Sequence, residues 1–420
     1  MAPTFFYIPA EVHGIPLFGW GLLLAVWAVA SVVVLARLAW RQGFNADTWS
    51  YVPILLLIGA VIRWLLPAIS EAKGLPIRGY GVMMFLAVVA GTALAVRRGR
   101  RVGVDPESIF SLAFWLLVPG IVGGRTFYVI HFWRDDFWPV YLQDGLAALL
   151  REVVSVNKGG LVVYGAFFGG MAGLLAFSRK HRLPLLAWCD LIAPSMILGV
   201  AIGRIGCLLN GCCYGAVCDA RWGITFPPNS PPYVSQVERG QMYGLRLDAN
   251  PDLPPVVRAV ERGSLADRAG LKAGERIRLI NRLEISTSRD AYWALREALA
   301  HQQPVRIELT GGASINLTAI VVPARSRPVY PTQIYSTIDG LLLCLLLLAY
   351  TPFRRRDGEV FALLISVYPI TRFLIESLRC DEAAVFGTGM SIAQNVSIVL
   401  LIAAAALWFY ILRQPLRQSN

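Results

Sequence analysis

Charged residues are scarce in this chain, and their scarcity excludes an ordinary soluble domain. Asp, Glu, Lys and Arg make up 16 % of the 420 residues, against roughly a quarter in a typical soluble protein. Hydrophobic residues make up 56 %. They fall in discrete blocks that are long enough to cross the ~30 Å of hydrocarbon in a bilayer. The sequence therefore predicts a protein that is embedded in a membrane.

Histidine is scarce as well, and any sign of a cleaved leader is lacking. The chain has only 4 histidines, and no two of them have the spacing of a metal-binding pair. The N-terminus lacks the basic start and the small-residue cleavage site of a signal peptide. We therefore expect no histidine-based metal site, and we expect the first apolar block to stay in the mature protein.

The net charge of +12 would suit a nucleic-acid partner, but the placement of the basic residues argues against one. They gather in clusters that directly follow apolar blocks, where the cytoplasmic loops of membrane proteins carry Lys and Arg. The clusters are Arg97, Arg98, Arg100 and Arg101; Arg179, Lys180 and Arg182; and Arg354, Arg355 and Arg356. We therefore predict membrane lipids, and no nucleic acid, as partners.

The apolar blocks predict an all-α polytopic membrane protein with about nine transmembrane helices. The predicted spans are residues 18–36, 53–67, 80–96, 109–130, 160–177, 188–208, 333–350, 360–378 and 392–412. The basic clusters follow the third, fifth and seventh spans, and a basic tail follows the ninth. All of them lie on one side if every span crosses the membrane. This topology places the N-terminus outside the cytoplasm and the C-terminus inside.

Residues 233–323 form a polar insert between the sixth and seventh spans. Residues 256–260 alternate like a strand, and residues 288–300 have the pattern of an amphipathic helix. Residues 263–277 resemble the GSxAxxAGLxxGDxI run of PDZ domains of the bacterial envelope type, with Glu275 in place of the usual Asp. PDZ domains bind an extended peptide at a sheet edge. The peptide-carboxylate loop would be Gly244, Leu245, Arg246 and Leu247.

We therefore predict a small α/β PDZ-like domain outside the cytoplasm, with a possible peptide ligand. The alternative is a structural insert that binds no ligand. The predicted domain organisation has four parts: extra N-terminal helices in residues 1–74, a first part of the membrane core in 75–232, the insert in 233–323, and a second part of the core in 324–420.

Polar side chains gather at the outward ends of six predicted spans. An ionisable group in hydrocarbon is costly, so such groups usually face a bundle interior and mark a functional site. Arginines with tyrosines and amides suit a phosphate held at the depth of a lipid headgroup. A transporter would instead gather its charges near the midplane. The residues are Arg78, Tyr80, Arg125, Tyr164, Arg204, Asn210, Gln333, Tyr335, Tyr368, Arg372 and Glu376.

The spacing of Arg372 and Glu376 puts both on one helix face, where they can pair. Glu376 is then either the ion-pair partner of Arg372 or a proton acceptor, and the sequence favours the partner role.

These motifs resemble the prolipoprotein diacylglyceryl transferase family over about residues 75–215 and 328–412. The most specific piece is Gly203-Arg204-Ile205-Gly206, followed by Asn210-Gly211 and Gly215, which is similar to the signature of that family. Supporting pieces are residues 77–81, Gly124-Arg125, the glycine-rich run 160–170, residues 330–335, and Tyr368 with Arg372 and Glu376.

The resemblance implies a transferase of the bacterial cytoplasmic membrane that moves the diacylglyceryl group of phosphatidylglycerol onto the lipobox cysteine of a prolipoprotein. Arg204 and Arg372 would stabilise the phosphate as charge builds on the leaving oxygen, and Glu376 and Tyr164 are the other catalytic candidates. No metal or organic cofactor is implied. Substrate binding would fall to Arg78, Tyr80, Arg125, Asn210, Gly215, Gln333, Tyr335 and Tyr368.

The chain departs from the family pattern at three positions. Tyr164 stands where some members have a histidine suspected as the base, Cys207 where an Asn is common, and Cys212 where a Glu is common. The alternative function is therefore a non-catalytic lipid-binding scaffold whose insert recruits an envelope partner. For the cysteines at 207, 212, 213 and 218, three states stay open: plain packing, a disulfide that involves Cys218, or a metal bound by all four.

Overall fold

A computed structural model describes residues 4–43, 49, 51–71, 73–155, 160, 162–228, 230–248, 252–301, 303–317, 325–379 and 387–415. The chain divides into two compact units. Unit 1 comprises Val200–Leu343 and Ala362–Tyr410, and unit 2 comprises Ala2–Gly199, Cys344–Phe361 and Ile411–Asn420.

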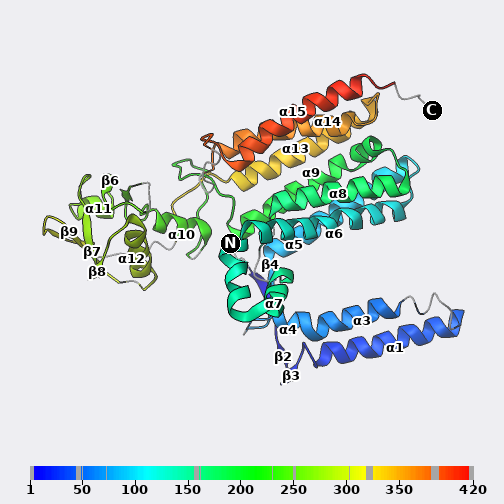
Figure 1. Cartoon of the computed structure of the whole chain (residues 1–420), viewed down its shortest axis with the longest axis horizontal. Coiled ribbons are helices and arrows are strands. Elements are labelled where there is room, and N and C mark those ends of the chain that lie inside the picture. The colour runs from blue at the N-terminus through cyan, green and yellow to red at the C-terminus, as the bar shows by residue number, and fades with distance from the viewer. Residues whose placement is uncertain are drawn as a thin grey trace. The chain divides into compact units, whose positions relative to one another are not determined.

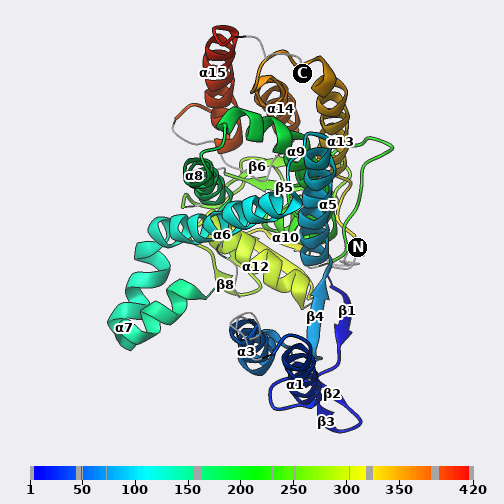
Figure 2. The ribbon, with the colours of Figure 1, turned by 90° about the vertical axis from the view of Figure 1, so that its right-hand side faces the viewer.

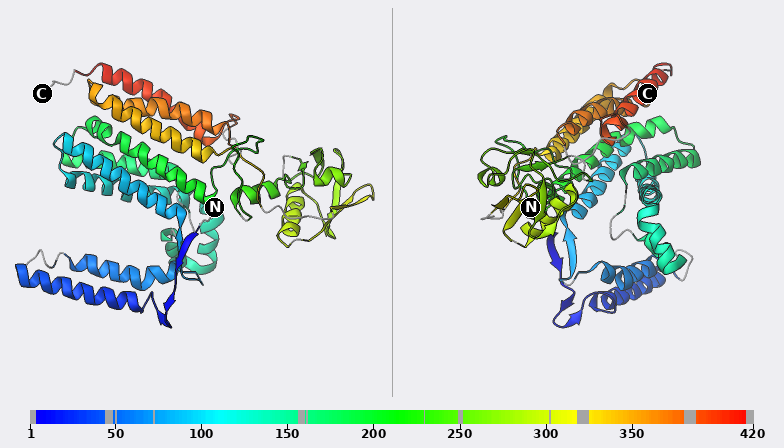
Figure 3. Two further views of the ribbon diagram at one scale, coloured as in Figure 1. Left: turned by 180° about the vertical axis from the view of Figure 1, so that it is seen from behind. Right: turned by 60° about the vertical axis from the view of Figure 1, so that its left-hand side comes forward.

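The first helices of unit 2 form a hairpin. Helix α1 (Leu22–Gln42) lies beside α3 (Val52–Ala60), as Figure 3 shows, and the indole N–H of Trp27 donates to the carbonyl of Leu55 at 3.1 Å. A π-helical turn (Val61–Leu65) and α4 (Leu66–Ile69) continue α3. Most side chains of this hairpin are exposed within the protein, as expected for helices that face lipid.

A short sheet leads into the next helix of unit 2. Strand β1 (Thr4–Ile8) pairs antiparallel with β4 (Leu75–Arg78), and β4 runs directly into α5 (Gly79–Arg101), as Figure 2 shows. Two shorter strands, β2 (Glu11–Val12) and β3 (Ile15–Pro16), form a separate antiparallel pair.

Glycines let helices α6 (Pro106–His131) and α8 (Val163–His181) approach closely. A Cβ added to Gly165 would lie 2.3 Å from the carbonyl oxygen of Gly123, and one added to Gly169 would lie 2.1 Å from that of Pro119. Such contacts require glycine, because any side chain would push the backbones apart. The described part of the glycine-rich run thus serves helix packing.

Along the chain, a π-helical turn (Trp133–Phe137) and α7 (Trp138–Val154) lie between α6 and α8.

A buried ion network ties several segments of unit 2 together. Asp190 is fully buried, and its carboxylate accepts the backbone N–H groups of Gly358 and Phe361 at 2.8 and 2.9 Å. Arg354 pairs with the same carboxylate at 3.3 Å, while buried Arg98 donates to the Asp190 carbonyl at 3.0 Å. The sequence treated Arg98 and Arg354 only as markers of cytoplasmic loops, so their structural role was missed.

Unit 1 contains the end of α9 (Leu185–Asn210) and most of three further helices. Helices α13 (Thr332–Tyr350), α14 (Glu359–Glu376) and α15 (Ile392–Leu412) run side by side there (Figure 1). Thr371 of α14 donates to Asp339 of α13 at 2.9 Å, and Trp408 of α15 donates to Ser366 of α14 at 3.0 Å.

The insert predicted at 233–323 is a small α/β domain within unit 1. Its sheet has the strand order β10 (Ser314–Leu317), β9 (Val305–Leu309), β7 (Ile277–Ile280), β8 (Leu283–Glu284), and a second pair joins β5 (Leu245–Leu247) to β6 (Val257–Val260). Helices α10 (Pro231–Glu238), α11 (Leu265–Arg268) and α12 (Ser288–Ala300) complete it. Buried side chains from both sheets and from α10 and α12 form one hydrophobic core. The α/β prediction for this segment is confirmed.

Seven helical segments of the described chain are long and apolar enough to cross a membrane. They are Leu22–Trp40, Val52–Ile69, Gly79–Arg101, Pro106–His131, Leu185–Asn210, Thr332–Phe353 and Ile392–Leu412. The polytopic helical architecture is therefore confirmed. Two further predicted spans correspond to helices α8 and α14, of 19 and 18 residues, which are not among the seven. The count of nine stays a prediction.

Candidate active site

A buried carboxylate organises the charged residues of unit 1. The side chain of Glu376, at the end of α14, is 2 % exposed and forms ion pairs with Arg372 and, at 3.0 Å, with Arg379. Its second oxygen accepts a hydrogen bond from the Ser391 hydroxyl at 3.2 Å. Both guanidinium groups are themselves largely buried, with 12 % and 6 % of their side chains exposed. The predicted pairing of Arg372 with Glu376 is present.

Arg204, on the last turns of α9, adds a third guanidinium group. Its charge interacts with Tyr368 of α14 and with Arg379. In the described part of unit 1, this cluster holds three guanidinium groups against one carboxylate. Because like charges repel strongly in a partly buried site, such a cluster is stabilised by an added anion. Planar guanidinium groups are also well suited to bind phosphate oxygens in pairs.

A strained turn follows α9 directly. Gly211 and Cys213 both have left-handed backbone angles, with φ of 77° and 58°. A left-handed φ is costly for a residue with a side chain, and it persists only where the surroundings hold it. Two buried side chains of α13 do so here, because Thr332 donates to the Cys213 carbonyl at 2.6 Å and Gln333 to the Cys212 carbonyl at 2.7 Å.

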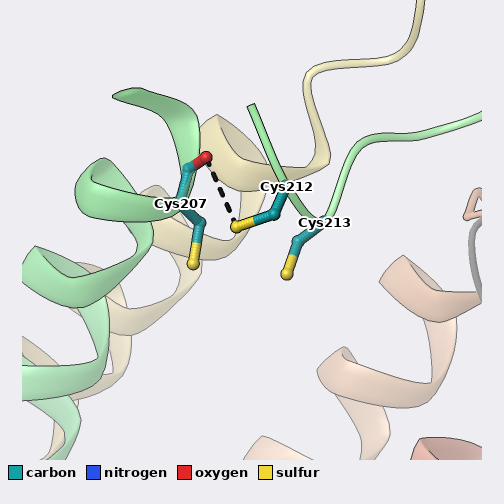
Figure 4. Close-up of side chains that lie close together, drawn as sticks. All are labelled: Cys207, Cys212 and Cys213. Carbon is teal, nitrogen blue, oxygen red and sulfur yellow. Dashed lines mark hydrogen bonds between the residues drawn. The ribbon is translucent and has the colours of Figure 1, made fainter. Parts of the chain in front are cut away.

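The turn brings three thiols together. The sulfur atoms of Cys207, Cys212 and Cys213 lie within 4.8 Å of one another, and Figure 4 shows them converging from α9 and the turn. Cys218, which the sequence grouped with them, is a buried free thiol outside this cluster. The structure therefore brings together three of the four cysteines, and it shows no disulfide among the described ones.

The surroundings of Cys213 favour its thiolate form. Hydrogen bonds from the thiols of Cys207 and Cys212 lower the pKa of Cys213 the most, and the positive charges of Arg204 and Arg379 lower that pKa further. Burial raises the pKa of Cys213, but its effect is smaller than the combined lowering by these groups. A thiolate is therefore stabilised within reach of the arginine cluster.

The other predicted residues of unit 1 surround this turn. Gln333 is fully buried, and its amide oxygen has no hydrogen-bond partner within the described structure. The hydroxyl of Tyr335 accepts the indole N–H of Trp222 at 2.8 Å. Gly215 has no room for a side chain, since an added Cβ would lie 2.6 Å from Tyr330. Asn210 is exposed at the end of α9.

The predicted residues of unit 2 differ in their exposure and contacts. Arg78 is exposed and pairs with Glu71 at 3.2 Å, beside a cavity of about 850 Å³ that both residues line. Tyr80, in the first turn of α5, is 41 % exposed. Tyr164 lies in α8, and its side chain is outside the described part of the structure.

Arg125 is engaged by backbone carbonyls. Its guanidinium group donates to Glu152 at 2.6 Å, to Val153 at 2.8 Å and to Gly160 at 3.2 Å. The first two carbonyls lie in the last turn of α7, where a positive charge complements the helix dipole. Arg125 thus holds the end of α7, and its predicted role in substrate binding stays a prediction.

Sequence reasoning missed Arg379 and Ser391. Glu376 and Arg379 are three residues apart, a spacing that favours an ion pair on one helix face. Arg379 lies just past the end of the predicted span, and this signal was not used. Ser391 gave no signal, because its contact with Glu376 closes a loop between two helices.

In the insert, the predicted peptide-carboxylate loop lies at the start of β5. The N–H of Leu245 donates to the Gly240 carbonyl at 3.1 Å, and that of Leu247 donates to the Tyr292 hydroxyl at 2.9 Å. Leu245 and Leu247 are buried, Arg246 is exposed, and Gly244 has a left-handed φ of 74°.

The apolar helices and the arginine–glutamate cluster define the class first: a polytopic membrane protein with a charged site built among its helices. A sequence model of the family described as prolipoprotein diacylglyceryl transferase matches residues 67–410. A phosphatidylglycerol–prolipoprotein diacylglyceryl transferase of Rhodopirellula baltica is 30 % identical over 457 aligned residues, which cover 97 % of this chain and 89 % of the relative. The chain belongs to the prolipoprotein diacylglyceryl transferase family, and it is a membrane transferase of lipoprotein biosynthesis.

Two further relatives carry the same description. A second transferase of Clostridium perfringens is 27 % identical over 340 residues, covering 81 % of this chain and 93 % of the relative. The transferase of Synechococcus elongatus is 33 % identical over 166 residues, covering 40 % of this chain and 54 % of the relative.

Proposed function

We propose that this chain transfers the diacylglyceryl group of phosphatidylglycerol to the thiol of the lipobox cysteine in a prolipoprotein. The observation that carries the proposal is the pairing of Arg372 and Arg379 with Glu376, together with Arg204, whose charge interacts with Arg379, in a chain that belongs to this family. The excess positive charge of these residues suits the phosphate of the lipid.

In the reaction, the cysteine sulfur forms a bond to the terminal glyceryl carbon while the bond from that carbon to the phosphate oxygen breaks. The electron pair stays on that oxygen, and glycerol phosphate leaves. Negative charge therefore grows on the phosphate in the transition state. Guanidinium groups held in place before the reaction stabilise that charge without reorganisation, which lowers the barrier. Arg204 and Arg372 take this role.

Glu376 acts as the anchor of the arginines in this proposal. Its two oxygens are occupied by Arg372, Arg379 and Ser391. With both oxygens occupied, this carboxylate holds the two guanidinium groups in place. Tyr164, the remaining catalytic candidate, is the proposed proton acceptor, on its position in the sequence alone.

Gln333 binds the lipid headgroup in this proposal. A buried amide oxygen without a partner costs about 1–3 kcal/mol, so a ligand that donates a hydrogen bond to it would bind more tightly. The glycerol headgroup of phosphatidylglycerol carries two hydroxyl groups that can donate. The rest of the predicted substrate-binding set is Tyr335, Tyr368, Asn210 and Gly215 in unit 1 and Arg78, Tyr80 and Arg125 in unit 2.

We further propose that the chain lies in the bacterial cytoplasmic membrane with the N-terminus outside, the C-terminus inside and the PDZ-like insert in the periplasm. The charge clusters of the sequence support this topology.

The insert is proposed to bind an extended peptide at the edge of β5 that does not pair with β6. Since the Tyr292 hydroxyl already accepts the Leu247 N–H, a peptide must displace it. Replacing Tyr292 by Phe should therefore tighten binding of C-terminal peptides to the whole protein, measured by fluorescence polarisation. Unchanged binding would place the ligand elsewhere, and no binding by either form would support a structural insert.

The direct test is a reconstituted assay. Purified protein is mixed with radiolabelled phosphatidylglycerol and a short lipobox peptide, with a Cys→Ser peptide as the matched control. We expect a thioether product by mass spectrometry, formed only with the cysteine peptide, together with glycerol phosphate. Retained lipid without any product would favour the scaffold alternative.

A further inference from the structure

The three-thiol cluster of Cys207, Cys212 and Cys213 is not used by the reaction as described above. Its sulfur atoms converge within 4.8 Å. All three residues are half-buried, so a small ion and a substrate group can reach them. The cluster also lies beside the arginines, because the charges of Arg204 and Arg379 act on Cys213.

The backbone at this cluster adopts a conformation that is unfavourable in free energy. Cys213 keeps a left-handed φ of 58°, and the buried side chains of Thr332 and Gln333 clamp the carbonyls of the turn. The Cys212 N–H donates to the Cys207 carbonyl at 3.1 Å, which joins the turn to α9. Strain of this kind is typical of a binding site whose ligands are placed in advance.

The arrangement suits a thiophilic metal ion better than the alternatives. A disulfide would use two of the three sulfurs and leave the third beside it without a role. Zinc binds thiolates at about 2.3 Å in a tetrahedral arrangement, which requires sulfur atoms about 3.8 Å apart. The three sulfur atoms lie within 4.8 Å of one another, so small side-chain rotations would bring them to that separation. Within the described chain, no fourth Cys, His, Asp or Glu joins the group.

We propose that Cys207, Cys212 and Cys213 bind one thiophilic divalent ion of the zinc type, and that the open fourth position binds the thiol of the substrate cysteine. The second part rests on the proposed function. Three protein ligands with an open position are typical of catalytic zinc sites. This ion is an addition to what the family resemblance implies, since that resemblance involves no metal.

The bound ion would make a separate general base unnecessary. A thiol that binds zinc loses its proton, which passes to water. The resulting thiolate donates its electron pair to the glyceryl carbon, and the electron pair of the breaking C–O bond stays on the phosphate. The product thioether binds the ion weakly and leaves. Three thiolates and one divalent ion carry a charge of −1, which the positive charge of Arg204 balances.

The first experiment measures metal binding without activity. The wild-type protein, purified without chelator, is assayed by elemental mass spectrometry, and then loaded with Co²⁺ for absorption spectroscopy. We expect about one ion per chain and an intense sulfur-to-cobalt band in the near ultraviolet. A metal content below about 0.1 per chain, even after loading with Zn²⁺ or Co²⁺, would overturn the proposal. So would a disulfide among the three residues in freshly purified protein.

Matched variants assign the ligands. Cys207→Ser and Cys213→Ser should each weaken Co²⁺ binding at least tenfold. Cys344→Ser is the control, because its thiol only donates to the Pro194 carbonyl, a role that a hydroxyl can fill. Equal loss in all three variants would contradict the assignment, as would wild-type affinity in the first two.

Binding of the substrate thiol to the ion is tested by spectroscopy and by turnover. Addition of a lipobox peptide should shift the cobalt band, and its Cys→Ser form should not. Metal-stripped protein should lose at least tenfold in transfer rate and regain it with Zn²⁺. Full activity without metal would overturn the catalytic role while leaving the proposed function intact. A peptide-dependent cobalt shift without transfer would instead support the site and count against the proposed function.

Discussion

At the scale of single residues, the arginines are the proposed binding groups for the lipid phosphate. Arg372 of α14 pairs with Glu376, and Arg204 of α9 interacts through its charge with Arg379, the second ion-pair partner of that carboxylate. Replacing Arg204 or Arg372 by Ala should lower transfer at least ~100-fold, because removing one preorganised donor costs that much. Lys variants should recover part of the rate, since they keep the charge but lose the paired hydrogen bonds.

The measurement is turnover in the reconstituted assay at equal amounts of inserted protein. Arg289→Ala is the control, because Arg289 is an exposed residue of the insert that pairs with Asp252. Normal turnover by Arg204→Ala or Arg372→Ala would remove the phosphate assignment.

Substitution of Glu376 distinguishes two roles for its carboxylate: an anchor for the arginines or a proton acceptor in the reaction. Replacing it by Gln leaves two largely buried guanidinium groups without their counter-charge, so we expect the free energy of unfolding to fall by about 3–5 kcal/mol. Ser391→Ala should cost only about 1 kcal/mol, since it removes one hydrogen bond. Both are measured by denaturation in detergent. A Glu376→Gln protein with wild-type stability and no transfer would support the base instead.

At the scale of elements, glycine positions set the distance between α6 and α8. Gly169 and Gly170 are neighbours, yet a Cβ at Gly169 would lie 2.1 Å from a backbone oxygen, whereas one at Gly170 would be 3.6 Å from its nearest neighbour. Gly169→Ala should therefore lower the melting temperature by several degrees. Gly170→Ala should have no measurable effect. Equal melting of the two variants would argue against close packing at this position.

Prediction from sequence succeeded for elements with a strong local signal. The apolar blocks became helices, and the pattern at 288–300 became α12. The described glycines of the run 160–170 contact α6. The sequence could not name that helix, because a local pattern does not reveal which helix lies opposite.

At the scale of the whole molecule, the insert is joined to the rest of unit 1 by two paired chain segments. The Ser326 N–H donates to the Phe226 carbonyl at 2.8 Å, so the two ends of the insert lie next to each other. A short Gly/Ser linker in place of residues 228–324 should therefore close without strain. Turnover on a short peptide should stay within about threefold of wild type, while full-length prolipoprotein is used less well.

The matched control is a linker variant that also carries Arg204→Ala, which should be inactive. If the linker variant alone loses turnover on the short peptide, the insert belongs to the active site.

The polar residues near the ends of the predicted spans were visible in the sequence, since ionisable groups in apolar blocks stand out against their surroundings. Sequence by itself determined the membrane class, the α/β insert, the pairing of Arg372 with Glu376 and the family motifs. Only the tertiary structure decided that Arg379 and Ser391 share the Glu376 carboxylate, that Arg125 caps α7, and that three cysteines rather than four converge. These contacts depend on how loops and helix ends meet, and the side chains of α13 that fix the cysteine turn lie more than a hundred residues away along the chain.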